Sequence, residues 1–175
     1  MPLTPFHLGP ALFFGLLLFS AVYLPTFLVA NIIVDFEPFL VLIFRLNYPL
    51  HGFFHSFLGG SIIAAILSLV MIRVDERIQK IMRLFKLEQQ FFRRSIWIAS
   101  FSGVYLHIML DSRLYTDIKP FFPLSINPLY SGARDIRNIR FLCDFVSIGC
   151  WFICVQNVET QSSLARKIVL NAIKL

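Results

Sequence analysis

The sequence predicts an all-α fold: a polytopic transmembrane bundle of about four to five membrane helices, with a basic amphipathic helix on the membrane surface. Two observations predict this class. Of 175 residues, 57% are hydrophobic and only 15% are charged, whereas a soluble domain carries about 25% charged residues. Each membrane helix needs about 20 apolar residues, so the chain has room for little besides such segments.

Prolines and turn residues divide the apolar sequence into helices. Thr4-Pro5 is a typical helix start, and Pro25 can open a second helix. Pro38 is expected to kink or restart the chain. No basic region precedes Phe13, so the first segment is predicted to be retained rather than cleaved as a signal peptide. The predicted helices cover about residues 5–20, 25–36, 51–72, 95–114 and 138–158, with a proline-rich loop at 115–136.

The segment 73–94 differs sharply from its neighbours. It is rich in arginine and lysine, and apolar residues recur in it at helical spacing, which is typical of a helix lying on a membrane surface. If this segment is cytoplasmic, as basic segments usually are, the loop 115–136 lies on the other side. The whole chain, 1–175, is predicted to be one membrane domain, comprising a core at 1–125, this interfacial segment, and an additional helix and tail at 138–175.

The net charge of +6 does not indicate nucleic-acid binding. Such binding requires a basic face with aromatic side chains available for stacking, whereas most of the 20 phenylalanines lie inside apolar runs. The expected partners are membrane lipid and a small-molecule or lipid substrate. Cys143, Cys150 and Cys154 share one helical face in an apolar run, which favours packing over a disulfide.

Ionisable residues inside membrane segments are costly and often functional. All four histidines lie in or beside the predicted helices, as do several carboxylates. Two pairs are spaced i, i+4, which places each pair on one helical face if the segment is helical. In an up-and-down bundle, the helix ends that carry these residues lie at one membrane face. The candidate ligands are His7, Asp35, His51, His55, His107 and Asp111, with Asp117 as a weaker candidate.

Imidazole and carboxylate ligands suit a divalent metal, with zinc the first expectation and manganese or iron as alternatives. Glu37 and Asp35 are the candidate catalytic carboxylates, and Glu37 can instead orient a ligating histidine. The alternatives without a metal are interfacial histidines, a polar helix terminus at residues 35–38, and a solvated pair formed by Asp117 and Lys119. Convergence of all six ligands at one face favours the metal site.

At these residues the sequence resembles the membrane-bound metal-dependent hydrolases that include the LexA-regulated inner-membrane protein of enteric bacteria. The similarity covers about residues 1–125. This sequence differs from the family pattern at Glu37 and Pro38, where the family often has Asp and His. It differs also at His51, which lies one residue closer to His55 than the corresponding histidine does in the family motif. The matching pieces are Thr4-Pro5-Phe6-His7, Asp35-Phe36-Glu37-Pro38, His51-Gly52-Phe53-Phe54-His55-Ser56 and His107-Ile108-Met109-Leu110-Asp111.

The resemblance implies a helical membrane protein with a hydrolytic metal site built from these histidines and aspartates. The sequence therefore predicts metal-assisted hydrolysis of a phosphoester or lipid-derived substrate, at the non-cytoplasmic face of the membrane. Three rivals stay open: a metal-ion or proton transporter, a bis-histidine haem protein, and a non-catalytic structural membrane protein.

Overall fold

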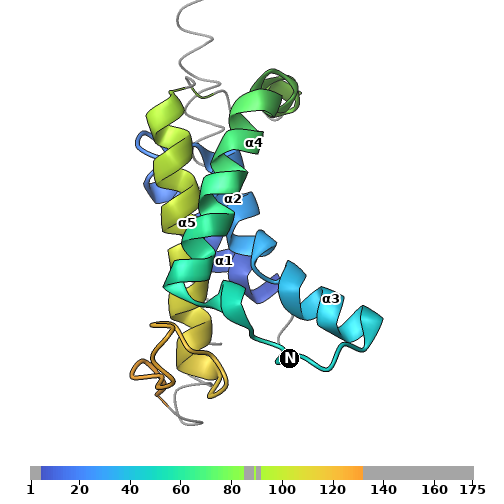
Figure 1. Cartoon of the computed structure of the whole chain (residues 1–175). Helices are drawn as coiled ribbons and strands as arrows, with labels where there is room; N and C mark the ends of the chain where they lie inside the picture. The colour runs from blue at the N-terminus through green and yellow to red at the C-terminus, as the bar shows by residue number, and fades with distance from the viewer. Residues whose placement is uncertain (1–4, 85–88, 90–91, 132–175) are drawn as a thin grey trace, which may run out of the picture.

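The fold, seen in a computed structural model, is a bundle of α-helices (Figure 1). The structure describes residues 5–84, 89 and 92–131, and within these ranges it contains no β-strand. The predicted all-α class is therefore confirmed. The predicted helix at 138–158 and the three cysteines lie outside the described residues. The elements are α1 (Pro5–Leu17), α2 (Leu24–Ile33), α3 (Phe36–Phe44), the 3₁₀ turn η1 (Phe53–His55), α4 (Phe57–Leu84) and α5 (Arg93–Leu114).

Proline and a left-handed residue set the bounds of α2 and α3. Pro25 occupies the first turn of α2, where its missing N–H costs nothing. Pro38 lies in the first turn of α3, so the chain restarts a helix there, as predicted. Arg45 ends α3 in the left-handed conformation, with φ 49°.

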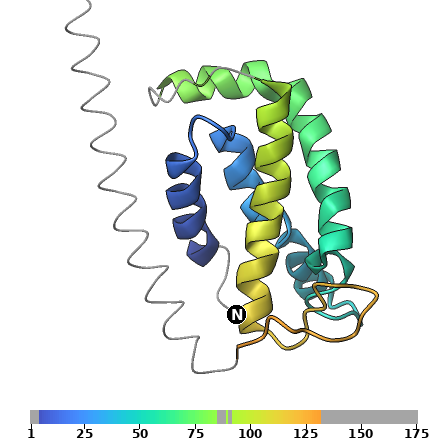
Figure 2. The ribbon, with the colours of Figure 1, turned by 90° about the vertical axis from the view of Figure 1, so that its left-hand side faces the viewer.

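The helix α5 lies at the centre of the bundle, against α2 on one side and α4 on the other (Figure 2). Two glycines permit this close packing. A Cβ on Gly103 would lie 2.6 Å from Ala30 Cβ and 2.9 Å from the carbonyl oxygen of Phe27, both on α2. A Cβ on Gly60 of α4 would lie 2.6 Å from Ile108 Cδ1 on α5. Small residues at such contacts are typical of packed membrane helices.

The helix α4 begins later than the sequence predicts. Residues 51 and 52 are non-helical, η1 covers Phe53–His55, and α4 starts at Phe57. The prediction that a helix begins near His51 is therefore wrong, and His51 and His55 do not occupy successive turns of an α-helix. Asn47, Pro49 and Gly52 favour non-helical backbone here. At its other end, α4 continues through the first part of the basic segment, to Leu84, and crosses that end of the bundle (Figure 2).

Two helical segments in the described ranges are long and apolar enough to cross a membrane, fewer than the four to five predicted. They are 24–44, comprising α2 and α3, and 57–84, comprising α4. With only 13 residues, α1 is too short to span the hydrocarbon core by itself. Serines and charged residues lower the apolarity of α5. These lengths and compositions support association with a membrane.

Candidate metal centre

Four elements bring their polar ends together at one end of the bundle. His7 lies in the first turn of α1, and Asp35 lies at the junction of α2 and α3. His55 ends η1, immediately before α4, and Asp111 lies in the last turn of α5. Because α1, α2, α4 and α5 alternate in direction, these ends converge as the up-and-down arrangement predicts.

The first group contains four potential ligands, His7, Asp35, His107 and Asp111. One potential ligand atom from each lies within 4.8 Å of the others. His7 Nε2 is 3.0 Å from Asp111 Oδ1, and His107 Nε2 is 3.3 Å from Asp111 Oδ2 and 3.5 Å from Asp35 Oδ1. His7, His107 and Asp111 are buried, whereas the Asp35 side chain retains 20% exposure.

The second group contains His51, His55 and again Asp111, and one potential ligand atom from each also lies within 4.8 Å of the others. All three residues are buried. The ring centroids of His51 and His55 lie 4.8 Å apart, and those of His55 and His107 lie 5.7 Å apart. Asp111 therefore joins the two groups into one cluster that includes all six ligands predicted from the sequence.

Three of the histidines share one feature: an oxygen acceptor holds Nδ1. The acceptor is Glu37 Oε2 for His55 at 2.9 Å, and the Asn31 carbonyl for His107 at 2.7 Å. For His51 it is Asp117 Oδ2, also at 2.9 Å. A carbonyl or carboxylate can only accept, so in each pair Nδ1 carries the proton and donates it. Each neutral ring then presents its lone pair at Nε2, as in most metal-bound histidines.

Several polar atoms in the cluster are buried and form no hydrogen bond of good geometry. They are His55 Nε2, His107 Nε2 and Asp35 Oδ2, together with Asp111 Oδ1, which nevertheless lies 3.0 Å from His7 Nε2. Once His107 has donated Nδ1–H to Asn31, its Nε2 lone pair faces two carboxylates. Acceptors that face one another repel, so the arrangement requires a cation, either a proton on Nε2 or a metal ion bound to both residues.

Burial lowers the pKa of His55, because desolvation penalises the charged imidazolium. The hydrogen bond from Nδ1 to Glu37 acts in the opposite direction but does not outweigh burial. His55 is therefore neutral near pH 7, the form in which imidazole binds metals.

The charge balance of the cluster also favours a cation. In the described part of the chain, no arginine or lysine lies within 4.0 Å of Asp35, Glu37, Asp111 or Asp117, whose ion-pair partners are all histidines. A mixed set of imidazole nitrogens and carboxylate oxygens fits zinc, manganese or iron. The donor set, the protons at Nδ1 and the unpaired buried atoms are thus all consistent with a bound divalent metal.

Sequence reasoning missed two contributors. The carbonyl of Asn31 holds His107, and Tyr115 lies against His51 with ring centroids 4.4 Å apart. A backbone acceptor leaves no signal in the residue pattern. Asp117, a weaker ligand candidate from the sequence, instead supports His51 from a half-exposed position, with 47% of its side chain exposed.

Comparisons with models of known protein families, with curated proteins and with solved structures gave no match to this chain.

Proposed function

We propose that this chain is a multi-pass membrane protein with a metal-dependent hydrolytic centre, which acts on a phosphoester or another lipid-derived substrate. The observation that carries the proposal is the orientation of the three anchored histidines. Each Nδ1 is held by an oxygen. Nε2 of His55 is buried without a hydrogen-bond partner, and Nε2 of His107 faces carboxylate oxygens of Asp111 and Asp35 at 3.3 and 3.5 Å. A purely structural histidine would be expected to use both nitrogens, because an unsatisfied buried polar atom costs about 1–3 kcal/mol.

The two groups that meet at Asp111 would hold two ions, with zinc the best fit to the donors. The first group offers four protein ligands, and the second offers three, which leaves a position for water or substrate. Bound metal would supply a water of lowered pKa and polarise the scissile group.

The carboxylates have distinct roles in this proposal. Glu37 positions His55 through Nδ1 and also accepts from the Phe54 N–H at 3.5 Å, so its oxygens are already engaged. Asp35 Oδ2 accepts no hydrogen bond, and Asp35 is the most exposed ligand of its group. It is therefore the carboxylate best placed to take a proton from the attacking water.

A transporter is the main rival, and the position of the cluster argues against it. Transported ions usually bind near the bilayer midplane on broken helices. Here His7, His55 and Asp111 lie at the ends of α1, η1 and α5, and His55 is two residues before the long apolar helix α4. Of the described ligands, Asp35 alone lies within a candidate span, at the α2–α3 junction. In the proposed orientation the basic residues of 73–94 face the cytoplasm and the centre faces the opposite side.

Hydrolysis by metal-stripped and zinc-reloaded protein tests the proposal, with phospholipids and lipid phosphate monoesters as substrates in detergent micelles. Asp111→Asn should abolish zinc-dependent phosphate or headgroup release. Asp75→Asn is the matched control, because Asp75 hydrogen-bonds Tyr23 and lies roughly 27 Å along α4 from its start. If Asp111→Asn hydrolyses these substrates as fast as the wild type, or if only ion flux into vesicles depends on Asp111, the hydrolase proposal is wrong.

A further inference from the structure

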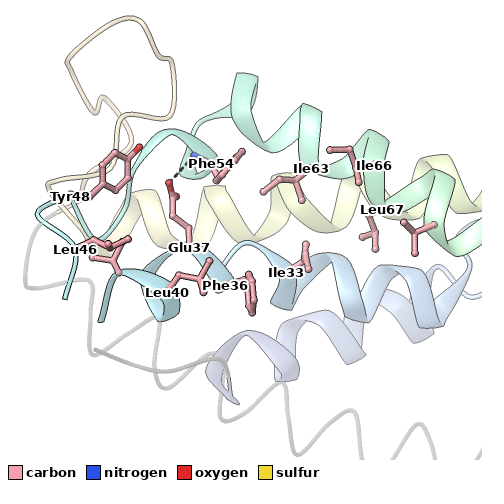
Figure 3. Close-up of a pocket in the computed structure, with 12 residues that line it drawn as sticks. Ile33, Phe36, Glu37, Leu40, Leu46, Tyr48, Phe54, Ile63, Ile66 and Leu67 are labelled. Atoms are coloured by element: carbon pink, nitrogen blue, oxygen red, sulfur yellow. Dashed lines mark hydrogen bonds between the residues drawn. The ribbon is translucent and has the colours of Figure 1, made fainter. Parts of the chain in front are cut away.

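An apolar groove of about 550 Å³ runs between α2–α3 and α4 (Figure 3). Apart from Glu37 and Tyr48, its walls are aliphatic or aromatic. Its size and lining are typical of a small-molecule site with a few polar groups at one end. The walls include Phe36 and Leu40 from α2–α3, and Ile63, Ile66 and Leu67 from α4.

The groove opens between the two segments of the described chain that can span a membrane, 24–44 and 57–84. Apolar side chains at its rim are exposed, among them Phe36 at 54% and Ile66 at 57%. In water such a rim would be unfavourable, whereas in a bilayer it would contact the hydrocarbon. In a bilayer the groove would therefore be accessible from the lipid phase.

The polar end of the groove joins the metal centre. Glu37 lines the groove and accepts the Nδ1–H of His55 at 2.9 Å. Tyr48, the other polar lining residue, accepts a hydrogen bond from the Phe53 N–H at 3.1 Å. Figure 3 shows Glu37 and Tyr48 at one end of the groove and Ile66 and Leu67 towards the other. A molecule lying along the groove would thus place one end beside the histidine cluster.

The length of the groove fits a lipid chain. The α4 wall from Ile63 to Val70 extends about 10 Å at 1.5 Å per residue. One leaflet contributes roughly 15 Å of hydrocarbon, half of the bilayer core. The α4 wall alone therefore covers about two thirds of such a chain, and Phe54, Glu37 and Tyr48 continue the groove towards the histidine cluster.

We propose that this groove binds one acyl chain of a membrane lipid and thereby presents the lipid's polar end to the histidine–aspartate cluster. The inference rests on the proposed function, because it names the substrate class as a chain-bearing lipid. The proposal also explains why Glu37 both lines the groove and accepts the hydrogen bond from His55. Glu37 lies at the boundary between the acyl-chain site and the metal site.

Photolabelling tests acyl-chain binding without requiring hydrolysis. The full chain would be reconstituted in phosphatidylcholine vesicles that contain a phospholipid with a diazirine near the end of one acyl chain. After irradiation, peptide mass spectrometry should find labels concentrated on Ile63, Ile66 and Leu67. Ile66→Trp, which fills the groove, should reduce this labelling about tenfold, equivalent to about 1.4 kcal/mol of lost binding. Ile62→Trp is the matched control, because Ile62 is also an exposed isoleucine of α4 but does not line the groove.

Two results would overturn the proposal. Equal labelling of Ile62 and Ile66, with no effect of either tryptophan, would mean that the groove is ordinary lipid-facing surface. The second result would be an absence of lipid labels together with crosslinks from a photoreactive residue at position 66 to residues 138–158. It would mean that the polypeptide, and not a lipid, fills the groove. Labelling should persist in Asp111→Asn, so a failure of lipid binding is distinguishable from a failure of hydrolysis. Thermal unfolding of both tryptophan variants checks that each is folded.

Discussion

The hydrogen bond between Glu37 and His55 offers the sharpest test of how the proposed metal centre is organised. Glu37→Ala removes the acceptor 2.9 Å from His55 Nδ1. The ring is fully buried, so Nδ1–H is left without a partner, at a cost of about 1–3 kcal/mol. The ring also loses the contact that directs Nε2 towards the cluster. Removing such supporting partners typically weakens metal binding about 10–100-fold, equivalent to about 1.4–2.7 kcal/mol.

Competition between the purified protein and a zinc-chelating dye measures this change in affinity. Glu37→Gln should fall between the wild type and Glu37→Ala, because the amide oxygen can still accept from Nδ1 but carries no charge. Glu76→Ala provides the matched control: Glu76 is an exposed glutamate on α4, distant from the cluster. Unchanged zinc affinity in folded Glu37→Ala would refute the claim that Glu37 positions a ligand.

Three further substitutions separate support of the metal from packing of the fold. Asp117→Asn should weaken zinc binding less than tenfold in the same dye competition, because the acceptor of His51 is half exposed and an amide oxygen can replace it. A loss of zinc affinity as large as that of Glu37→Ala would contradict this expectation. Gly103→Ala should lower the free energy of unfolding by about 1–3 kcal/mol, since its Cβ would lie 2.6 Å from Ala30 Cβ; unchanged denaturant unfolding would show that α2 and α5 pack less closely. Gln89→Ala should reduce the thermal midpoint without altering zinc binding, because Gln89 accepts from one backbone N–H and donates to two carbonyls at the opposite end of the bundle; a change in zinc affinity would refute that separation.

The fold could be predicted from the sequence where a single residue type restricts the backbone. Pro38 can only begin or interrupt a helix, and α3 does restart there. The region around His51 could not be predicted in the same way. An i, i+4 pair of histidines fits a helix, but here the backbone is non-helical at residues 51 and 52 and forms η1 at 53–55. Tertiary contacts decide between these conformations, for example the 2.9 Å hydrogen bond from the Phe57 N–H to the Pro120 carbonyl.

The candidate site could be predicted because helix parity is a property of the sequence. Alternating helix directions bring His7, Asp35, His55 and Asp111 to one end, whatever the details of packing. The division into two groups that share Asp111 could not be predicted, since it depends on side-chain rotamers. The anchoring of His107 by the Asn31 carbonyl was also beyond prediction, because it depends on how α2 packs against α5.

Elemental mass spectrometry of the purified protein tests most directly whether the histidine–aspartate cluster binds metal. The detergent-solubilised wild type should contain zinc, manganese or iron in stoichiometric amount. His55→Ala should lose the ion of the second group, Asp111→Asn should lose metal from both groups because they share Asp111, and Asp75→Asn should retain the wild-type content, with circular dichroism confirming that all variants are folded. A folded wild type that contains no metal, even after dialysis against zinc, would contradict the account. The cluster would then be a hydrogen-bonded network that holds helix ends together.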